Sequence, residues 1–94
     1  MQKEIVEKLS RYYVLRKQLE ILLAEKTSLE EAKKLIEKQS NRKIYRFMGP
    51  FAIEVTYEEA KQYINNRLEL LDIEIKKIEK EIESLAKELE RIPL

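Results

Sequence analysis

Residues 43–48 read Lys-Ile-Tyr-Arg-Phe-Met, residues 49–50 read Gly-Pro, and residues 51–56 read Phe-Ala-Ile-Glu-Val-Thr. Both flanking runs are rich in β-branched and aromatic residues, which favour strands. The Gly-Pro between them favours a tight turn, and the chain has no other glycine. The stretch therefore predicts one β-hairpin, at about residues 43–56, in the middle of the chain.

A turn centred on residues 49–50 leaves large apolar side chains on both faces of this hairpin. One face carries Ile44, Met48, Phe51, Ile53 and Val55 with Arg46, and the other carries Tyr45, Phe47 and Ala52 with Glu54. A lone two-stranded hairpin is marginally stable and has two open edges. It could curl onto the end of its own helices, but that would not cover both faces and both edges. We therefore predict oligomerisation through the hairpin, with contacts from Ile44, Tyr45, Phe47, Met48, Phe51, Ile53 and Val55.

The segment after the hairpin, about residues 57–92, has an apolar repeat in alternating steps of four and three residues. The repeat consists of Ile64, Leu68, Leu71, Ile75, Ile78, Ile82, Leu85, Leu89 and Ile92. Such a repeat is typical of a coiled-coil helix. Thr56 and Glu59 fit a capping box at its start. We predict one long helix over this segment.

The segment before the hairpin, about residues 3–40, has the same period with more interruptions. Lysines occupy several of its seam positions, among them Lys8, Lys26 and Lys33. The heptad phase continues across Thr27 and Ser28, which predicts one unbroken helix. The alternative is that a second helix starts here, capped by Thr27 or Ser28.

The ranges 5–40 and 57–92 are equal in length, so the two helices can fold back on each other. In an antiparallel pair, residue i then faces roughly residue 97 − i. This rule brings apolar seam positions together and places Lys26 opposite Leu71, within reach of Asp72 or Glu74. The predicted fold is a mainly α, antiparallel coiled-coil hairpin with a β-hairpin inserted between its helices, as a single domain over residues 1–94.

Composition excludes several classes of function. The chain has no Cys or His, so it has no thiol nucleophile, no Ser-His-Asp triad and no soft-ligand zinc site, and one glycine cannot form a phosphate-binding loop. We expect no enzymatic activity, no cofactor, no metal and no membrane association. With 19 basic and 18 acidic residues, the net charge of +1 does not favour nucleic acid, although Arg42, Lys43 and Arg46 with Tyr45 and Phe47 leave that alternative open. Lack of Cys suits a cytoplasmic protein, and the Lys, Glu and Ile content suits a heat-adapted source.

The hairpin also carries a resemblance to a known family. Residues 43–49, Lys-Ile-Tyr-Arg-Phe-Met-Gly, resemble the Ile-Tyr-Lys-x-x-Gly strand of the β-class prefoldin subunits, and Glu58-Glu59-Ala60 then opens the second helix as in that family. The resemblance implies a hexamer of two α-class and four β-class subunits whose strands form a barrel-like base. It also implies an ATP-independent holdase that binds unfolded polypeptides at the ends of its coiled coils and passes them to a chaperonin, which would be of group II.

Typical β-class subunits are longer, which leaves a second reading open: a shortened structural adaptor subunit of another assembly. In either reading, the partners are α-class prefoldin subunits, copies of this chain, or both. For the holdase, we predict a client-binding surface at the free end of the two helices. It would consist of Ile5, Val6, Leu9, Leu89, Ile92 and Leu94. The alternative for Ile5, Leu9, Leu89 and Ile92 is that they close the coiled coil against each other.

Overall fold

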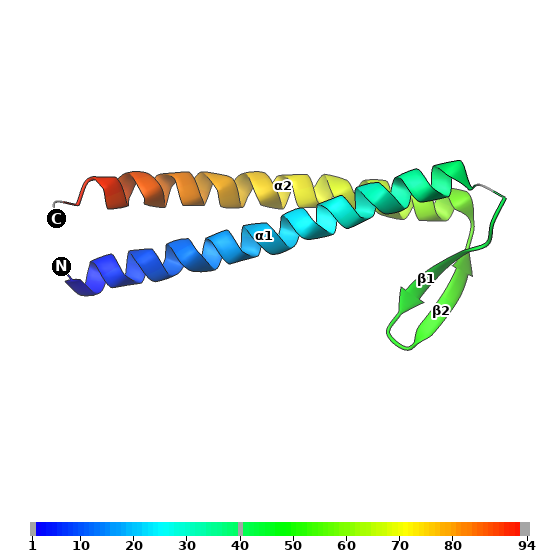
Figure 1. The fold of residues 1–94 in the computed structure, drawn as a ribbon, viewed down its shortest axis with the longest axis horizontal. Helices are drawn as coiled ribbons and strands as arrows, with labels where there is room; N and C mark the ends of the chain where they lie inside the picture. The colour runs from blue at the N-terminus through cyan, green and yellow to red at the C-terminus, as the bar shows by residue number, and fades with distance from the viewer. Residues whose placement is uncertain (1, 40, 93–94) are drawn as a thin grey trace.

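The computed structural model describes residues 2–39 and 41–92. Along the chain it contains α1 (Gln2–Lys38), β1 (Ile44–Met48), β2 (Phe51–Val55) and α2 (Tyr57–Glu90). The two helices run antiparallel, with both chain ends at one end of the molecule and the hairpin at the other (Figure 1). The predicted fold class, a helical hairpin with an inserted β-hairpin, is confirmed.

Helix α1 is continuous through the position where a second helix could have started. The Thr27 hydroxyl donates a hydrogen bond to the carbonyl of Leu23, at 3.0 Å, one turn back in the same helix. A side chain in that position does not cap a new helix, so the alternative of two shorter helices is wrong. Helices α1 and α2 end at Lys38 and Glu90, each two residues before the predicted ends.

Helix α2 begins as its sequence predicts. Thr56 is the N-cap in an extended conformation, and its hydroxyl oxygen accepts a hydrogen bond from the N–H of Glu59, at 3.1 Å. Glu58 and Glu59 add negative charge in the first turn, where it stabilises the positive end of the helix dipole. This cap fixes the point at which the chain leaves the hairpin.

The strands pair antiparallel in a single register, from Ile44 opposite Val55 at the base to Met48 opposite Phe51 at the tip. Gly49 has a φ of 60°, which a residue without a Cβ adopts at low cost, and Pro50 follows it with its restricted φ. A two-residue turn with Gly first is a common hairpin connection whose twist matches that of the strands. The register confirms the two predicted sets of side chains on opposite faces.

Packing between the helices is uneven along their length. The molecule measures 61 × 25 × 15 Å, too slender for a layered core. Its buried apolar side chains belong to Leu15, Ala60, Ile64, Leu71 and Ile75. None of the described residues in 2–14 or 76–92 is buried, and the helices diverge toward the chain ends (Figure 1). We call residues 15–38 with 57–82 the hairpin-proximal half, and residues 2–14 with 83–92 the terminal half.

Candidate functional site

The hairpin residues predicted to mediate assembly differ in exposure. Ile44 and Val55, at the base of the ladder, are half-buried. Phe47 and Phe51 are the most exposed, at 79% and 69%. The remaining three are exposed as well: Tyr45, Met48 and Ile53. The hairpin does bend toward its own helices, but this contact covers only its base.

One side chain holds the hairpin against α2. The guanidinium of Arg46 lies over the ring of Tyr63, at 4.2 Å from the ring centroid, which is a close cation–π contact. The sequence pattern placed Arg46 on the same face as Ile44 and Val55 but gave it no partner. Its partner could not be found from periodicity, because Tyr63 lies just outside the seam of α2.

A cavity of about 310 Å³ lies between the base of the hairpin and the two helices. Its walls include Ile36 from α1, Ile44 and Val55 from the hairpin, and Ala60 and Ile64 from α2. Most of these side chains are apolar, and Arg46 and Glu59 stand among the lining residues. The chain therefore carries an unfilled apolar space beside a hairpin with exposed aromatic rings.

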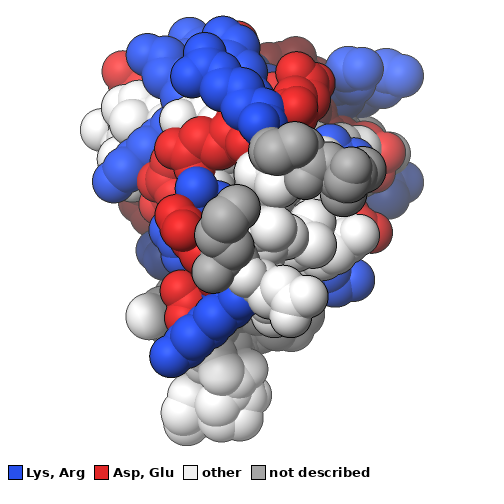
Figure 2. All heavy atoms as spheres, turned by 90° about the vertical axis from the view of Figure 1, so that its left-hand side faces the viewer, with Lys and Arg blue, Asp and Glu red and all other residues white. Residues whose placement is uncertain are grey.

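The second predicted surface lies at the opposite end, formed by the start of α1 and the end of α2. Val6 is 60% exposed and Leu9 is 38% exposed on α1, whereas Ile5, Leu89 and Ile92 are half-buried. Leu94 lies outside the described residues. Looking onto this end, Figure 2 shows uncharged side chains gathered together, with basic and acidic side chains around them. The seam side chains here lie toward the partner helix, but none is buried.

An ion pair ties the two helices together at this end. The Lys8 ammonium lies 3.5 Å from the carboxylate of Glu88 on α2 and 3.4 Å from that of Glu4 on its own helix. Because Lys8 occupies a seam position, a charged group stands where an apolar side chain would otherwise pack. Charge therefore borders the predicted client-binding residues and replaces apolar packing in the seam beneath them.

Two further ion pairs fix the register of the hairpin-proximal half. The Lys26 ammonium lies 2.8 Å from the carboxylate of Asp72, which confirms the contact predicted from the fold-back rule. Arg67 makes a bidentate pair with Glu25, at 2.6 and 3.0 Å. These hydrogen bonds lower the pKa of the Glu25 carboxyl, and the hydrogen bond to Asp72 raises the pKa of the Lys26 ammonium. The Glu25–Arg67 pair was not predicted, although both residues flank the seam on the same side.

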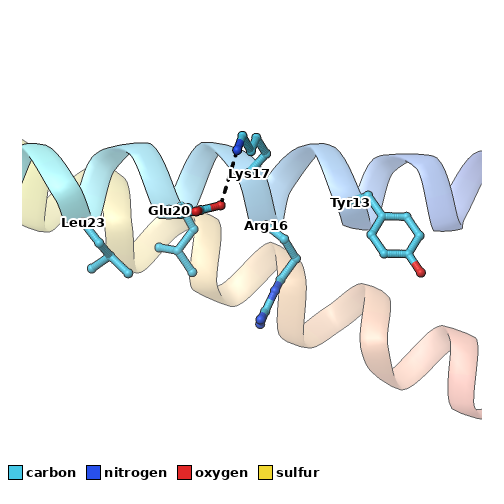
Figure 3. A pocket seen from close by; sticks show the side chains of 6 residues that line it. Tyr13, Arg16, Lys17, Glu20 and Leu23 are labelled. Carbon is cyan, nitrogen blue, oxygen red and sulfur yellow. Dashed lines mark ion pairs between the residues drawn. The ribbon is translucent and has the colours of Figure 1, made fainter.

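Sequence reasoning also missed a hollow on the surface of α1. It has a volume of about 480 Å³, and all of its lining residues belong to α1: Tyr13, Arg16, Lys17, Leu19, Glu20 and Leu23. Figure 3 shows Tyr13, Arg16 and Leu23 pointing to the same side of the helix. The hollow lies between the ring of Tyr13 and the methyl groups of Leu19 and Leu23, and its lining includes the Lys17–Glu20 ion pair, at 3.7 Å. It is too open to enclose a substrate.

Within residues 2–39 and 41–92, no three acidic, His or Cys side chains are grouped as metal ligands would be. None of the helices described there has a stretch apolar enough to cross a bilayer.

Comparison with known proteins finds relatives of this chain in one family. A family model described as "Prefoldin subunit" matches residues 3–92. The probable prefoldin subunit 6 of Caenorhabditis briggsae is 31% identical over 77 residues, and that of Caenorhabditis elegans is 30% identical over 77 residues. Each match covers 82% of this chain, and 59% and 60% of the respective relatives. The chain thus spans about three fifths of the length of these curated relatives.

Solved structures agree with the sequence matches. The prefoldin beta2 subunit from Thermococcus strain KS-1 superimposes with a TM-score of 0.90 at 26% identity, covering 98% of this chain and 100% of that chain. The prefoldin beta subunit from the same strain superimposes with a TM-score of 0.50 at 15% identity, covering 93% of this chain and 83% of that chain, and shows the fold alone. The match to the beta2 subunit extends over both helices and the hairpin.

Proposed function

This chain belongs to the prefoldin subunit family, and on that premise we propose that it is a subunit of an ATP-independent holdase. It assembles through its β-hairpin and binds unfolded polypeptides at the free ends of its helices. Its assembly partners are α-class prefoldin subunits, copies of itself, or both, and a group II chaperonin receives its clients. The assembly works in the cytoplasm.

The observation that carries this proposal is the separation of two apolar surfaces along a rod 61 Å long. One is the hairpin, whose exposed rings require a partner because so much apolar surface is unfavourable in water. The other is the terminal half, where Val6 and Leu9 are exposed and the seam beneath them is not buried. An assembly surface at one end leaves the other end free to bind clients.

We expect each proposed contact with a client to be weak and non-specific. Helix ends open locally at little cost in free energy, so the side chains there can adapt to different segments. Several arms in one assembly then bind the same client, which raises the overall affinity without a tighter individual contact. No nucleotide-binding motif is needed for such a mechanism.

Suppression of aggregation of a denatured client tests the client surface. We expect the triple variant Val6→Ser, Leu9→Ser and Ile92→Ser to lose most of its protection while keeping its helix content and assembly mass. The matched control is Ile21→Ser with Leu35→Ser, which removes two exposed apolar side chains from α1 outside the terminal half. Full protection by the triple variant would place the client surface elsewhere, for example further up the arms. No protection by the wild type, alone or with an α-class subunit, would favour the adaptor reading.

The mass of the assembly tests the hairpin separately. Phe47 and Ile53 lie on opposite faces of the sheet, so at least one of them belongs to an intersubunit contact if the hairpin assembles. Phe47→Asp or Ile53→Asp would bury an unpaired charge there, at a cost of several kcal/mol. We expect a lower mass by light scattering with unchanged circular dichroism. Wild-type mass in both variants would contradict assembly through the strands.

A further inference from the structure

We propose that the open edge of β2 pairs with the β2 edge of a second copy of this chain, antiparallel and centred on Ile53. This inference rests on the proposed assembly through the hairpin, and it names the edge, the register and the partner. Four features of the hairpin support it: the position of its strands, its backbone pattern, its charges and the cavity at its base.

The two edges of the hairpin differ in access. Of the two strands, β1 lies closer to α2, because its Arg46 packs on Tyr63 and its residues Ile44 to Arg46 line the cavity, where β2 contributes only Val55. In Figure 1, β1 lies on the side of the hairpin nearer the helices and β2 on the far side. The contacts of β1 with α2 leave less room for another strand beside β1 than beside β2, whose residues 51–54 are exposed.

The backbone pattern selects the register. Residues 49–50 form a two-residue turn, which closes on a pair of residues that exchange hydrogen bonds. From there the bonding direction alternates, so Phe51, Ile53 and Val55 turn their N–H and C=O groups toward β1. Ala52 and Glu54 turn theirs to the open edge. A pairing centred on Ile53 sets Ala52 opposite Glu54 of the second copy, so these outward groups meet, and it overlaps the strand over its full length.

Charge distinguishes this pairing from its counterpart on β1. Centred on Ile53, the pairing sets Ile53 against the same residue of the second copy and leaves no like charges directly opposite. The equivalent full-length pairing of β1 is centred on Arg46 and would set two guanidinium groups opposite each other, which is destabilising. That pairing would also remove Arg46 from the ring of Tyr63.

The cavity offers a place for the aromatic ring that this pairing brings. In this register the first residue of one strand meets the last residue of the other, so Phe51 lies opposite Val55 of the second copy. Both belong to the face that includes Ile44 and Arg46, and Val55 lines the cavity. A cavity of about 310 Å³ has ample room for a phenyl ring, since about 150 Å³ suffices for benzene. Each copy thus places its Phe51 ring in the cavity of the other copy, and two-fold symmetry closes the contact.

Cysteine cross-linking tests the register, because the chain has no native cysteine. In the proposed pairing, the two Ile53 residues form a pair without mutual hydrogen bonds, with Cα atoms about 4.5 Å apart, which is within disulfide range. We expect Ile53→Cys to form a disulfide-linked dimer of twice the 11.3 kDa chain mass under mild oxidation. Arg46→Cys, the matched control on the same face of β1, should remain largely monomeric on a non-reducing gel.

A second pair of variants checks the ends of the strand. Phe51→Cys and Val55→Cys should each cross-link poorly alone, because like residues are far apart in this register, but should cross-link to each other when mixed. Equal or stronger cross-linking of Arg46→Cys than of Ile53→Cys would overturn the choice of β2. No cross-link in an Ile53→Cys protein that still assembles would overturn the register and leave the proposed function intact.

The mass of the wild-type chain separates this inference from the proposed function. A chain that is monomeric alone but assembles with an α-class subunit would overturn pairing between copies, while assembly through the hairpin would stand. A chain that is monomeric in both conditions would overturn both proposals.

Discussion

The terminal half and the hairpin-proximal half of the coiled coil have the same apolar repeat on α2 but pack differently. In the hairpin-proximal half, Leu71 is fully buried and Ile64 and Ile75 nearly so. In the terminal half, Leu85 and Leu89 occupy equivalent positions of the repeat and remain half-buried. The regular repeat of α2 therefore sets which face turns inward, but it does not set how tightly the helices close.

The difference comes from α1 and from the hairpin. The residues that α1 presents to the terminal half include Lys8 and Tyr12, a charged and a bulky polar side chain, whereas Leu15, Leu22 and Leu29 face the hairpin-proximal half. The base of the hairpin adds further cover at that end through Ile44 and Val55. The repeat of α2 thus sets the register, and the seam side chains of α1 determine where the two helices separate.

The largest expected effect comes from one substitution made in both halves. Leu71→Ala should lower the free energy of unfolding by about 2–5 kcal/mol, because it leaves a cavity in fully buried packing. Leu89→Ala makes the same chemical change at a half-buried site and should cost only about 1 kcal/mol. Urea unfolding followed by circular dichroism, at one protein concentration, measures both. Equal losses would mean that the terminal half is packed as tightly as the other half in solution.

Lys26→Leu tests whether a seam lysine is kept for register rather than stability. The substitution replaces an ion pair with Asp72 in which both side chains are more than one third exposed, and such pairs add little stability. Leucine would add apolar contact opposite Leu71, so we expect the melting temperature to rise by a few degrees. A clear fall would show that the Lys26–Asp72 pair stabilises the fold itself.

Particular residues show how far the sequence alone could predict this molecule. The strand register, the faces of the hairpin and the Lys26–Asp72 contact all follow from spacings of two, three and four residues, which are local rules. The contact of Arg46 with Tyr63 and the cavity beside it depend on the angle at which the hairpin leaves the helices. No repeat encodes that angle. The opening of the terminal half also escaped prediction, because a repeat identifies the inward face but not the distance to the partner helix.

The Glu25–Arg67 pair was missed for a different reason. Both residues flank the seam, where the antiparallel fold-back sets like heptad positions against each other. The pairing of Glu25 with Arg67 could therefore have been predicted from the sequence once the register of the two helices was known. Assembly and client binding depend on surfaces that meet other chains, which no repeat within this chain encodes.

Lys8→Leu should make the terminal half resemble the other half. It removes the charged side chain from the seam, together with its contacts to Glu4 and Glu88, and lets an apolar side chain face Leu89. We expect slower amide hydrogen exchange over residues 85–90 and a modest rise in melting temperature. If the open seam serves client binding, protection against aggregation should fall at the same time. The control is Lys17→Leu, an exposed lysine of the same helix, which should change neither exchange nor protection.

The smallest expected effect is the pH dependence of the Glu25–Arg67 pair, which holds the helices together in the hairpin-proximal half. Hydrogen bonds from Arg67 lower the pKa of Glu25 in the folded chain, so its carboxylate stabilises the fold fully above the unfolded pKa of about 4.3. That stabilisation is lost as the pH falls through the lower folded pKa.

Glu25→Gln should therefore be slightly less stable than the wild type at pH 7, and the difference should vanish in acid once the wild-type carboxyl is protonated. The effect is small because Arg67 and Glu25 are 33% and 38% exposed, and water and salt screen their attraction. The matched control is Glu83→Gln in the terminal half, whose partner Lys87 lies one turn away on the same helix, with both side chains about two thirds exposed. Its removal should leave the free energy of unfolding nearly unchanged at both pH values. A difference for Glu25→Gln that persists in acid would mean that the loss does not come from the charge of this carboxylate, since a protonated carboxyl no longer attracts Arg67 by charge. Equal effects of the two substitutions would mean that an ion pair between the helices contributes no more than one within a single helix, and that apolar packing alone distinguishes the two halves.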